Sequence, residues 1–334
     1  GIPKDSAHRI KAGMKYILNN SLTEGNVFMP RDELLKAAAE LLSVDEEAAD
    51  NCLREMQIVH QIISETVDGI DAVYLMPMYY SEISAAKKLL ELSFCTEDMN
   101  VKEIEGKIDE AEDRTGISLA EQQRQAVREA LREGVLVITG GPGTGKTTII
   151  HTIIQIFSSM GKKAVLAAPT GRAAKRMTET SGEEAKTIHR LLGVAYSDEE
   201  NGRQKFEKDE SDPIEADVVI IDEVSMVDMQ LFNSLLKAIG PGTRLILVGD
   251  SSQLPSVAAG NVLKDIIKSG RIKTVRLTEI FRQARESAII MNAHRINEGI
   301  EPVMNGQNTD FFFVNAPYIR EIPAKIVELV TKRL

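Results

Sequence analysis

The stretch Val135-Leu136-Val137-Ile138-Thr139-Gly140-Gly141-Pro142-Gly143-Thr144-Gly145-Lys146-Thr147 decides the fold of this 334-residue chain. Its first five residues predict a buried strand, and the apolar run Thr147–Phe157 that follows predicts a helix. Between them, Gly140–Thr147 fits the pattern GxxxxGK[ST] in full. Glycines let such a loop wrap closely around phosphates, and the N–H groups at the helix start supply positive potential. The sequence therefore predicts a phosphate-binding strand–loop–helix unit.

Each residue of this loop has an expected role. Lys146 is expected to reach the β- and γ-phosphates of a nucleotide, and the Thr147 hydroxyl to bind Mg²⁺. The residues expected to bind the nucleotide are Gly141, Pro142, Gly143, Thr144, Gly145, Lys146, Thr147 and Thr148. A chance glycine-rich turn would explain the loop alone, but it would not require a strand before it and a helix after it.

Further strand-like runs alternate with helical ones along the rest of the chain. These runs are Ala164–Ala168, Val218–Asp222 and Arg244–Gly249. Such alternation predicts βαβ units, and therefore an α/β fold with a parallel sheet.

Polar residues stand where two of these strands end. Asp222-Glu223 closes the run Val218–Ile221, at the sheet edge where open α/β folds bind ligands. Asp222 is expected to hold Mg²⁺, and Glu223 is the candidate base for an attacking water. Gln253, in the loop after Arg244–Gly249, could hydrogen-bond the γ-phosphate or that water. An acidic strand-to-helix turn and an ordinary polar loop are the structural alternatives.

Two more segments carry cations that could meet phosphate. Arg172, Lys175 and Arg176 follow Pro169-Thr170-Gly171, and Thr187–Leu192, with His189, could extend that surface. A solvated helix face would explain these charges equally well. Arg282, directly after Ile280-Phe281, could act as an arginine finger, although a surface ion pair is the commoner role.

Composition excludes several classes of protein. Hydrophobic residues make up 43% and charged residues 27%, as in ordinary globular chains. No apolar run approaches the roughly 18 residues that a membrane helix needs, and the first twenty residues lack a signal-peptide core. Two cysteines and five scattered histidines make neither a disulfide framework nor a zinc site. We expect a cytoplasmic protein without zinc.

The net charge of −10 is unevenly distributed. Residues 1–115 hold 12 Lys and Arg against 23 Asp and Glu, a balance of −11, so the remainder carries +1. His8–Leu18, Arg31–Leu42 and Asp45–Gln57 have helical spacing, and Val67–Asp71 separates two β-branched runs as a hairpin would. Helices followed by a hairpin suggest a winged-helix unit. A plain helical scaffold is the alternative, and an acidic domain is expected to contact protein rather than DNA.

One polar and charged insertion, Val194–Asp217, interrupts the α/β pattern. Asn201-Gly202 lies near its middle, and Asn-Gly is a strong signal for a hairpin turn. A surface loop without regular structure is the alternative.

Taken together, these segments resemble the first motor lobe of a superfamily 1 DNA helicase, in particular the RecD-like family, the exodeoxyribonuclease V alpha-subunit helicases, in the stand-alone form with an N-terminal extension. The resemblance rests on Leu119–Val127 for the Q-motif, Gly140–Thr147 for motif I, Pro169–Ala174 for Ia, Asp222-Glu223-Val224-Ser225 for II, Gly249-Asp250 with Gln253-Leu254-Pro255 for III, and Phe281-Arg282-Gln283 for IV. Ile10–Leu18, Glu24–Val27 and Pro30 also resemble that family's N-terminal region.

The resemblance implies an ATP- and Mg²⁺-dependent 5′→3′ helicase of DNA repair or recombination, acting on single-stranded DNA and duplex junctions. Gln123 would read adenine, and Pro169, Thr170, Gly171, Arg172 and His189 would contact DNA. It implies a RecA-like sheet with helices on both faces over 116–334, a 1B hairpin near 194–217, a winged-helix-like domain over 1–80 and a helical connection over 81–115.

Nothing after Arg282 resembles motifs V and VI of a second lobe, so the chain is expected to be a fragment that binds nucleotide and hydrolyses it weakly. Two alternatives stay open. The motifs also occur in the motor part of conjugative relaxase-helicases. The chain could instead be a non-catalytic nucleic-acid- or protein-binding module with a structural nucleotide site.

Overall fold

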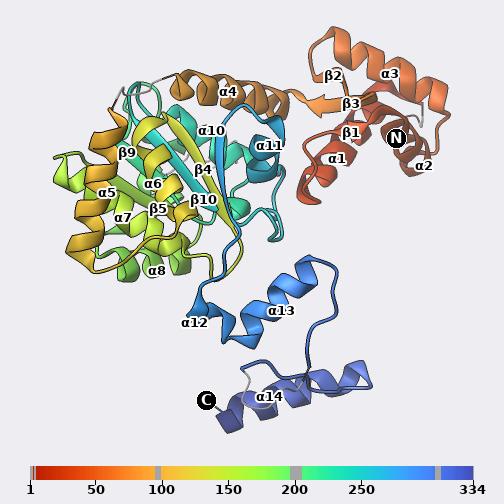
Figure 1. The fold of residues 1–334 in the computed structure, drawn as a ribbon. Coiled ribbons are helices and arrows are strands. Elements are labelled where there is room, and N and C mark those ends of the chain that lie inside the picture. Colours follow the sequence, from red (N-terminus) through yellow and green to blue (C-terminus); the bar gives the residue numbers. More distant parts are fainter. Residues whose placement is uncertain (1–2, 4, 95–98, 196–204, 305–309, 334) are drawn as a thin grey trace. The chain divides into compact units, whose positions relative to one another are not determined.

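The computed structural model describes the chain except residues 1–2, 4, 95–98, 196–204, 305–309 and 334 (Figure 1). The chain divides into two compact units. The first comprises Gly1–Gly140 with Gly145–Thr278, and the second comprises Gly141–Thr144 with Glu279–Leu334. Each unit is described by itself below.

A six-stranded, wholly parallel sheet forms the centre of the first unit. In spatial order its strands are β11 (Lys273–Leu277), β4 (Val135–Gly140), β10 (Arg244–Gly249), β9 (Val218–Ile221), β5 (Ala164–Ala168) and β6 (Ala185–Thr187). β4, β9 and β10 are almost wholly buried, which is why they are near-continuous apolar runs in sequence. The predicted α/β fold with a parallel sheet is confirmed.

Helices cover both faces of this sheet (Figure 1). One face meets α4 (Met76–Ser93), α9 (Ile188–Leu192), α10 (Met229–Lys237) and α11 (Val262–Ser269). The other face meets α5 (Val101–Thr115), α6 (Glu121–Arg132), α7 (Lys146–Ser159) and α8 (Gly171–Ser181). Alternate strand residues supply the two cores: Ile221 and Leu247 pack on the first side, and Ile220 and Ile246 on the second. Both helices of the expected 81–115 connection thus take part in these layers.

The N-terminal part folds as three helices and a small antiparallel sheet. Its elements are α1 (Ala7–Thr23), β1 (Met29–Pro30), α2 (Arg31–Leu42), α3 (Glu46–Ile58), β2 (Ile62–Val67) and β3 (Ile70–Leu75). The strand order is β1-β3-β2, and the predicted hairpin closes at Asp68-Gly69. Met14, Leu34 and Leu53, one from each helix, are fully buried together. β3 ends at Leu75, and α4 begins directly after it with Pro77 in its first turn, where proline is well suited.

The Val194–Asp217 insertion begins with a short antiparallel pair. β7 (Val194–Ala195) lies beside β8 (Lys205–Phe206), with Val194 opposite Phe206. This pairing agrees with the predicted hairpin. Its expected turn, Asn201-Gly202, lies outside the described residues.

The second unit is mainly helical. Its elements are α12 (Arg282–Arg285), α13 (Ala288–Asn297), the short 3₁₀ helix η2 (Ile319–Glu321) and α14 (Ile322–Arg333). The buried Asn292 side chain donates to Val303 O at 2.9 Å and accepts from Val303 N at 2.8 Å. These bonds join α13 to the segment that follows it.

The described residues contain no helix long and apolar enough to cross a membrane. Nor do three or more of their His, Cys, Asp and Glu side chains gather into a group that could hold a metal ion.

Candidate functional site

The loop between β4 and α7 has the backbone that its glycines allow. Gly143 and Gly145 have φ angles of 77° and 78°, in the left-handed region that residues with a Cβ avoid. Gly145 is the N-cap of α7, so the helix begins at Lys146. Thr144 donates its hydroxyl to Gly141 O at 2.8 Å and closes the loop on itself. A helix start preceded by such a loop offers N–H donors to a phosphate group.

Lys146 is held back along the strand that precedes the loop. Its Nζ donates to Gly140 O at 2.6 Å, and the side chain is half-buried. Burial lowers the pKa of the Lys146 ammonium, and the charges of Asp250, Asp222 and Glu223 act against that shift. The lysine therefore faces carboxylates from the ends of two neighbouring strands, β9 and β10.

The acidic pair follows β9 as the sequence predicts. Glu223 N donates to Asp222 Oδ1 at 2.9 Å, and Asp222 N donates to Ala167 O at 3.0 Å on β5. Glu223 has a φ of 55°, so the chain turns sharply at this residue. Burial is the main cause that raises the pKa of both carboxyls, while Lys146 and Arg176 act to lower them.

Magnesium fits the donors near the loop. Thr147 lies in the first turn of α7, and Asp222 directly follows β9; both residues are half-buried. Hydroxyl and carboxylate oxygens are the hard ligands that Mg²⁺ takes, usually with several waters.

A hydrogen bond joins the acidic turn to the loop after β10. Ser225 donates to Gln253 Oε1 at 3.3 Å, while Gln253 itself is exposed. Asp250 is only 4% exposed and accepts from Ser252 N at 2.9 Å. Ser251 N donates to Thr139 Oγ1 at 3.2 Å, which ties the same loop to β4. The acidic turn and the loop after β10 are thus joined by a side-chain hydrogen bond.

Gln123 lies at the start of α6 and is only 3% exposed. Its Oε1 accepts from Ala120 N at 3.0 Å and caps its own helix. The neighbouring Gln122 accepts from Thr278 N at 2.8 Å. The side chain expected to read adenine therefore has a structural partner in this conformation.

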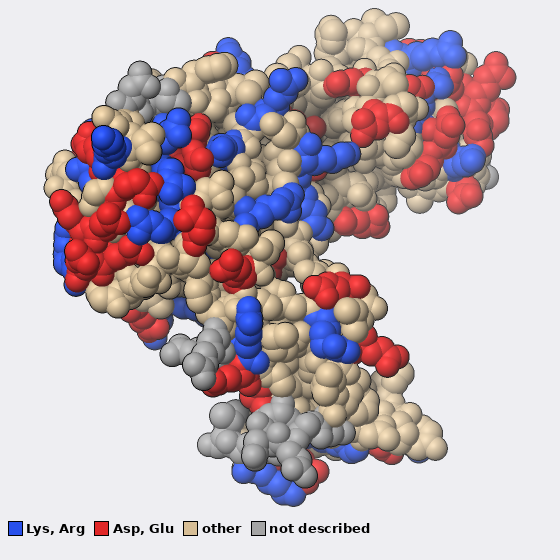
Figure 2. Space-filling view, viewed as in Figure 1, with Lys and Arg blue, Asp and Glu red and all other residues tan. Residues whose placement is uncertain are grey.

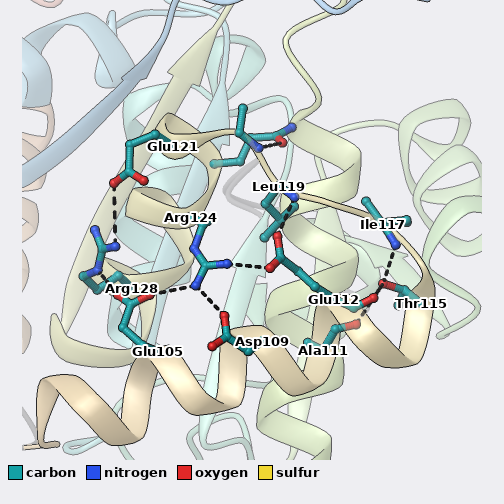
Figure 3. A network of polar contacts seen from close by, with 12 residues as sticks. Glu105, Asp109, Ala111, Glu112, Thr115, Ile117, Leu119, Glu121, Arg124 and Arg128 are labelled. Carbon is teal, nitrogen blue, oxygen red and sulfur yellow. Dashed lines mark hydrogen bonds and ion pairs between the residues drawn. The ribbon is translucent and has the colours of Figure 1, made fainter.

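A network of ion pairs fixes the helix that carries Gln123 (Figure 3). Arg124 of α6 meets three carboxylates of α5, those of Glu105, Asp109 and Glu112. Arg128 bridges Glu105 at 2.6 Å and Glu121 at 3.7 Å. These contacts lower the pKa of Glu105 through hydrogen bonds from the two arginines. The strongly charged segment expected as a connection is thus a brace for the predicted Q-motif helix.

The segment expected to bind DNA begins α8. Thr170 is its N-cap and accepts from Ala173 N at 3.2 Å, while Gly171 and Arg172 are exposed and Pro169 is half-buried. His189 lies on α9, with its ring 6.0 Å from that of Phe206 on β8. Arg172 is thus exposed and His189 half-buried, on two helices that follow the adjacent strands β5 and β6.

Arg282 opens α12 in the second unit, and its side chain lies outside the described residues. In the same unit, Phe281 N donates to Gly143 O at 3.2 Å, and His294 Nε2 lies 3.0 Å from Pro142 O. The predicted finger role of Arg282 stays a prediction.

Three residues near Lys146 escaped the sequence argument. Asp250 and Ser225 stand inside quoted motifs but had no role, and Arg176 was grouped with phosphate contacts on α8. Arg176 instead lies close enough to Asp222 and Glu223 to lower the pKa of both. Its position six residues after Thr170 was the only available signal, and helical spacing alone does not tell whether this side chain points toward the end of β9 or toward solvent.

Comparisons with known proteins agree with this site. Residues 123–259 match the model of the AAA domain family. The chain is 40% identical to the ATP-dependent RecD2 DNA helicase of Deinococcus radiodurans over 184 residues, which are 55% of this chain and 24% of that protein. It is 39% identical to the RecD subunit of the RecBCD enzyme of Mycobacterium tuberculosis over 170 residues, 44% of this chain and 28% of that one.

Among solved structures, a Pif1 helicase from Candida albicans is similar, with a TM-score of 0.41 and 26% identity. That match covers 56% of this chain and 45% of the other. The chain spans about a quarter of the length of the two curated relatives.

Proposed function

We propose that this chain, whose motor region is a RecD-like superfamily 1 helicase lobe, belongs to an ATP-dependent DNA helicase. The single observation that carries the proposal is the placement of Lys146 against Asp222, Glu223 and Asp250 at one edge of a parallel sheet, directly after a phosphate-binding loop. A cation and carboxylates at that edge suit a bound nucleotide and the water that attacks it.

Binding begins at the loop. Backbone N–H groups at the start of α7 bind the phosphates, and Lys146 leaves Gly140 O to meet the β- and γ-phosphates. The exchange is favourable because a phosphate oxygen carries more charge than a carbonyl. Gln123, already placed at the start of α6, gives up its helix-capping bond to read adenine.

Hydrolysis needs a base for water. Glu223 is suited to that role because burial raises its pKa and because it stands at the sharp turn that follows β9. Mg²⁺, held by Thr147 and Asp222, supplies charge neutralisation when bound. Gln253 meets the γ-phosphate or its water, and its bond to Ser225 links that contact to the acidic turn after β9.

DNA lies on the neighbouring helices. Pro169, Thr170, Gly171 and Arg172 at the start of α8, together with His189 on α9, bind the single strand. The β7–β8 hairpin is the 1B element that meets the duplex junction. Arg282 serves as an arginine finger for the same nucleotide.

The remaining features follow from the same family. The helicase moves 5′→3′ in DNA repair or recombination and works in the cytoplasm. Residues 1–80 form a winged-helix-like domain, 81–115 a helical connection, and 116–334 the motor lobe. The acidic N-terminal domain contacts a protein partner rather than DNA, because its carboxylates repel phosphate.

The test is ATP turnover with and without single-stranded DNA, by the protein and by its Lys146→Ala variant. Turnover that requires Lys146 and Mg²⁺, and unwinding of a 5′-tailed but not a 3′-tailed duplex by the full-length protein, would support the proposal. Absence of ATP turnover, together with activity of the full-length protein that is indifferent to Lys146→Ala, would favour a non-catalytic module with a structural nucleotide site.

A further inference from the structure

A groove of about 950 Å³ runs along the N-terminal domain and ends at the motor lobe. One wall comes from α1, the loop after it, and α2. The opposite wall is Gly260, Asn261 and Asp265, which directly follow the loop that carries Gln253. Gly260 N donates to Gly25 O at 3.0 Å, so the two walls are hydrogen-bonded to each other. The groove therefore touches both the N-terminal domain and the loop that contacts the acidic turn.

The floor of the groove is apolar and open to solvent. Tyr16 is 58% exposed and Leu41 is 52% exposed, and Ile17, Phe28 and Met29 lie half-buried beside them. Aromatic and aliphatic side chains gathered in one groove are unusual on a free surface and are typical of a docking site.

The charges around this floor have one sign. Glu24, Glu33, Glu40 and Asp265 line the groove, and no lysine or arginine is among its described lining residues. Glu24, Glu33 and Glu40 are exposed, while Asp265 has Lys264 and Lys268 near it. Figure 2 shows the acidic side chains crowded over the region of α1–α3. Nucleic acid and nucleotides, which are polyanions, are excluded as occupants by this rim.

We propose that this groove binds a basic amphipathic helix of a partner protein. Its apolar side chains would pack on Tyr16 and Leu41, and its lysines or arginines would meet Glu24, Glu33 and Glu40. The inference rests on that part of the proposed function which gives the N-terminal domain a protein partner, and it requires no ATP hydrolysis. An occupant would also touch Gly260 and Asn261, so the partner would be placed to act on the Gln253 loop.

The probe is a fluorescein-labelled amphipathic helix of about 18 residues, built from leucine and lysine. Its control is a peptide of the same composition whose order scatters the two residue types around the helix. Anisotropy is measured at about 0.15 M ionic strength, where weak long-range attraction is screened. We expect saturable binding of the amphipathic peptide, and binding of the scattered peptide that is weaker by about tenfold or more.

Two double variants of equal charge locate the site. Glu33→Lys with Glu40→Lys replaces two carboxylates of the groove by positive charges and should lower the affinity for the peptide by about tenfold or more. Glu47→Lys with Glu110→Lys makes the same change in net charge at exposed positions outside the groove. Glu47 matches Glu33 in lying in the first turn of its helix. This second variant should change the affinity by less than about threefold. Circular dichroism spectra establish that both variants are folded.

Leu41→Ser tests the apolar floor without a change in charge and should lower the affinity for the peptide severalfold. Equal binding of both peptides, equal effects of the two double variants, or tighter binding of an oligonucleotide than of the peptide would each overturn the inference. Lys146→Ala should bind the peptide normally. If the unaltered protein binds the peptide but shows no ATP turnover, the helicase proposal alone is contradicted. If it turns over ATP but does not bind the peptide, the groove proposal alone is contradicted.

Discussion

The edge of the parallel sheet and the N-terminal domain use charge in opposite ways. At the sheet edge, Lys146, Asp222 and Glu223 are half-buried, and burial shifts the pKa of each. In the N-terminal domain, Glu24, Glu33 and Glu40 are exposed, and no lysine or arginine is among the described residues that line the groove with them. Charged groups that are partly buried can take part in catalysis, whereas exposed charges of one sign attract binding partners of the opposite charge.

The largest expected effect breaks the chemistry at the sheet edge. Glu223→Gln removes the base but keeps the shape of the turn, so ATP turnover should fall by about 100-fold or more. Affinity for Mg²⁺·ATP should stay within about threefold, because the loop and Lys146 are intact. Steady-state turnover and nucleotide titration measure the two quantities. Unchanged turnover would show that Glu223 is only the N-terminal charge of a short helix.

The next effect concerns the brace of the motor lobe. Arg124→Ala leaves the carboxylates of Glu105, Asp109 and Glu112 facing one another without their shared cation. The free energy of unfolding should fall by about 2 kcal/mol, since the arginine is mostly buried. Urea unfolding measures it, with the exposed Arg132→Ala as the control. A loss of the same size in both variants would contradict a role for the network.

A smaller effect depends on pH and lies on α4. Burial, helped by Asp265 and Glu65, raises the pKa of Glu82 from 4.5 to about 7. The folded state therefore holds a proton on Glu82 that the unfolded state releases, and stability falls as pH rises from 4.5 to about 7. Glu82→Gln should remove about 1.5 kcal/mol of that fall. Urea unfolding at pH 5 and pH 8 tests this, and an equal fall in protein and variant would contradict it.

The smallest effect belongs to the N-terminal domain. Arg54 pairs with Asp50 at 2.7 Å one helical turn away, but its side chain is mostly exposed and Asp50 also meets Arg31. Arg54→Ala should lower the free energy of unfolding by less than about 0.5 kcal/mol. Compared with Arg124→Ala, this variant measures the difference between a mostly buried network and a surface pair. A larger loss of free energy of unfolding in Arg54→Ala than in Arg124→Ala would contradict that difference.

The strongest patterns in the sequence predicted the centre of the fold well. β5 and β10 have the predicted bounds, and β4 and β9 differ by one residue, because buried parallel strands are continuous apolar runs. β6 and β11 were not predicted. Ala185–Thr187 is too short to show a pattern. Lys273–Leu277 lies at the sheet edge and lacks the continuous apolar run by which the central strands were recognised.

The candidate site was predicted as residue types and only partly as geometry. Motif spacing placed Lys146, Asp222 and Glu223 at one sheet edge, and the structure brings them together. The helix cap formed by Gln123 and the bond from Ser225 to Gln253 depend on side-chain directions that spacing does not encode. The groove beside Tyr16 joins segments more than 200 residues apart, so no local pattern could reveal it.

The measurement that tests the central claim most directly is the affinity of the protein and of Lys146→Ala for Mg²⁺·ATP. It is determined by titration with a fluorescent ATP analogue. The account predicts saturable binding that requires Mg²⁺ and weakens by about tenfold or more in the variant, because a charge-assisted contact to phosphate is lost. Binding that is equally tight in the variant, or that ignores Mg²⁺, would contradict a nucleotide site at this edge of the sheet.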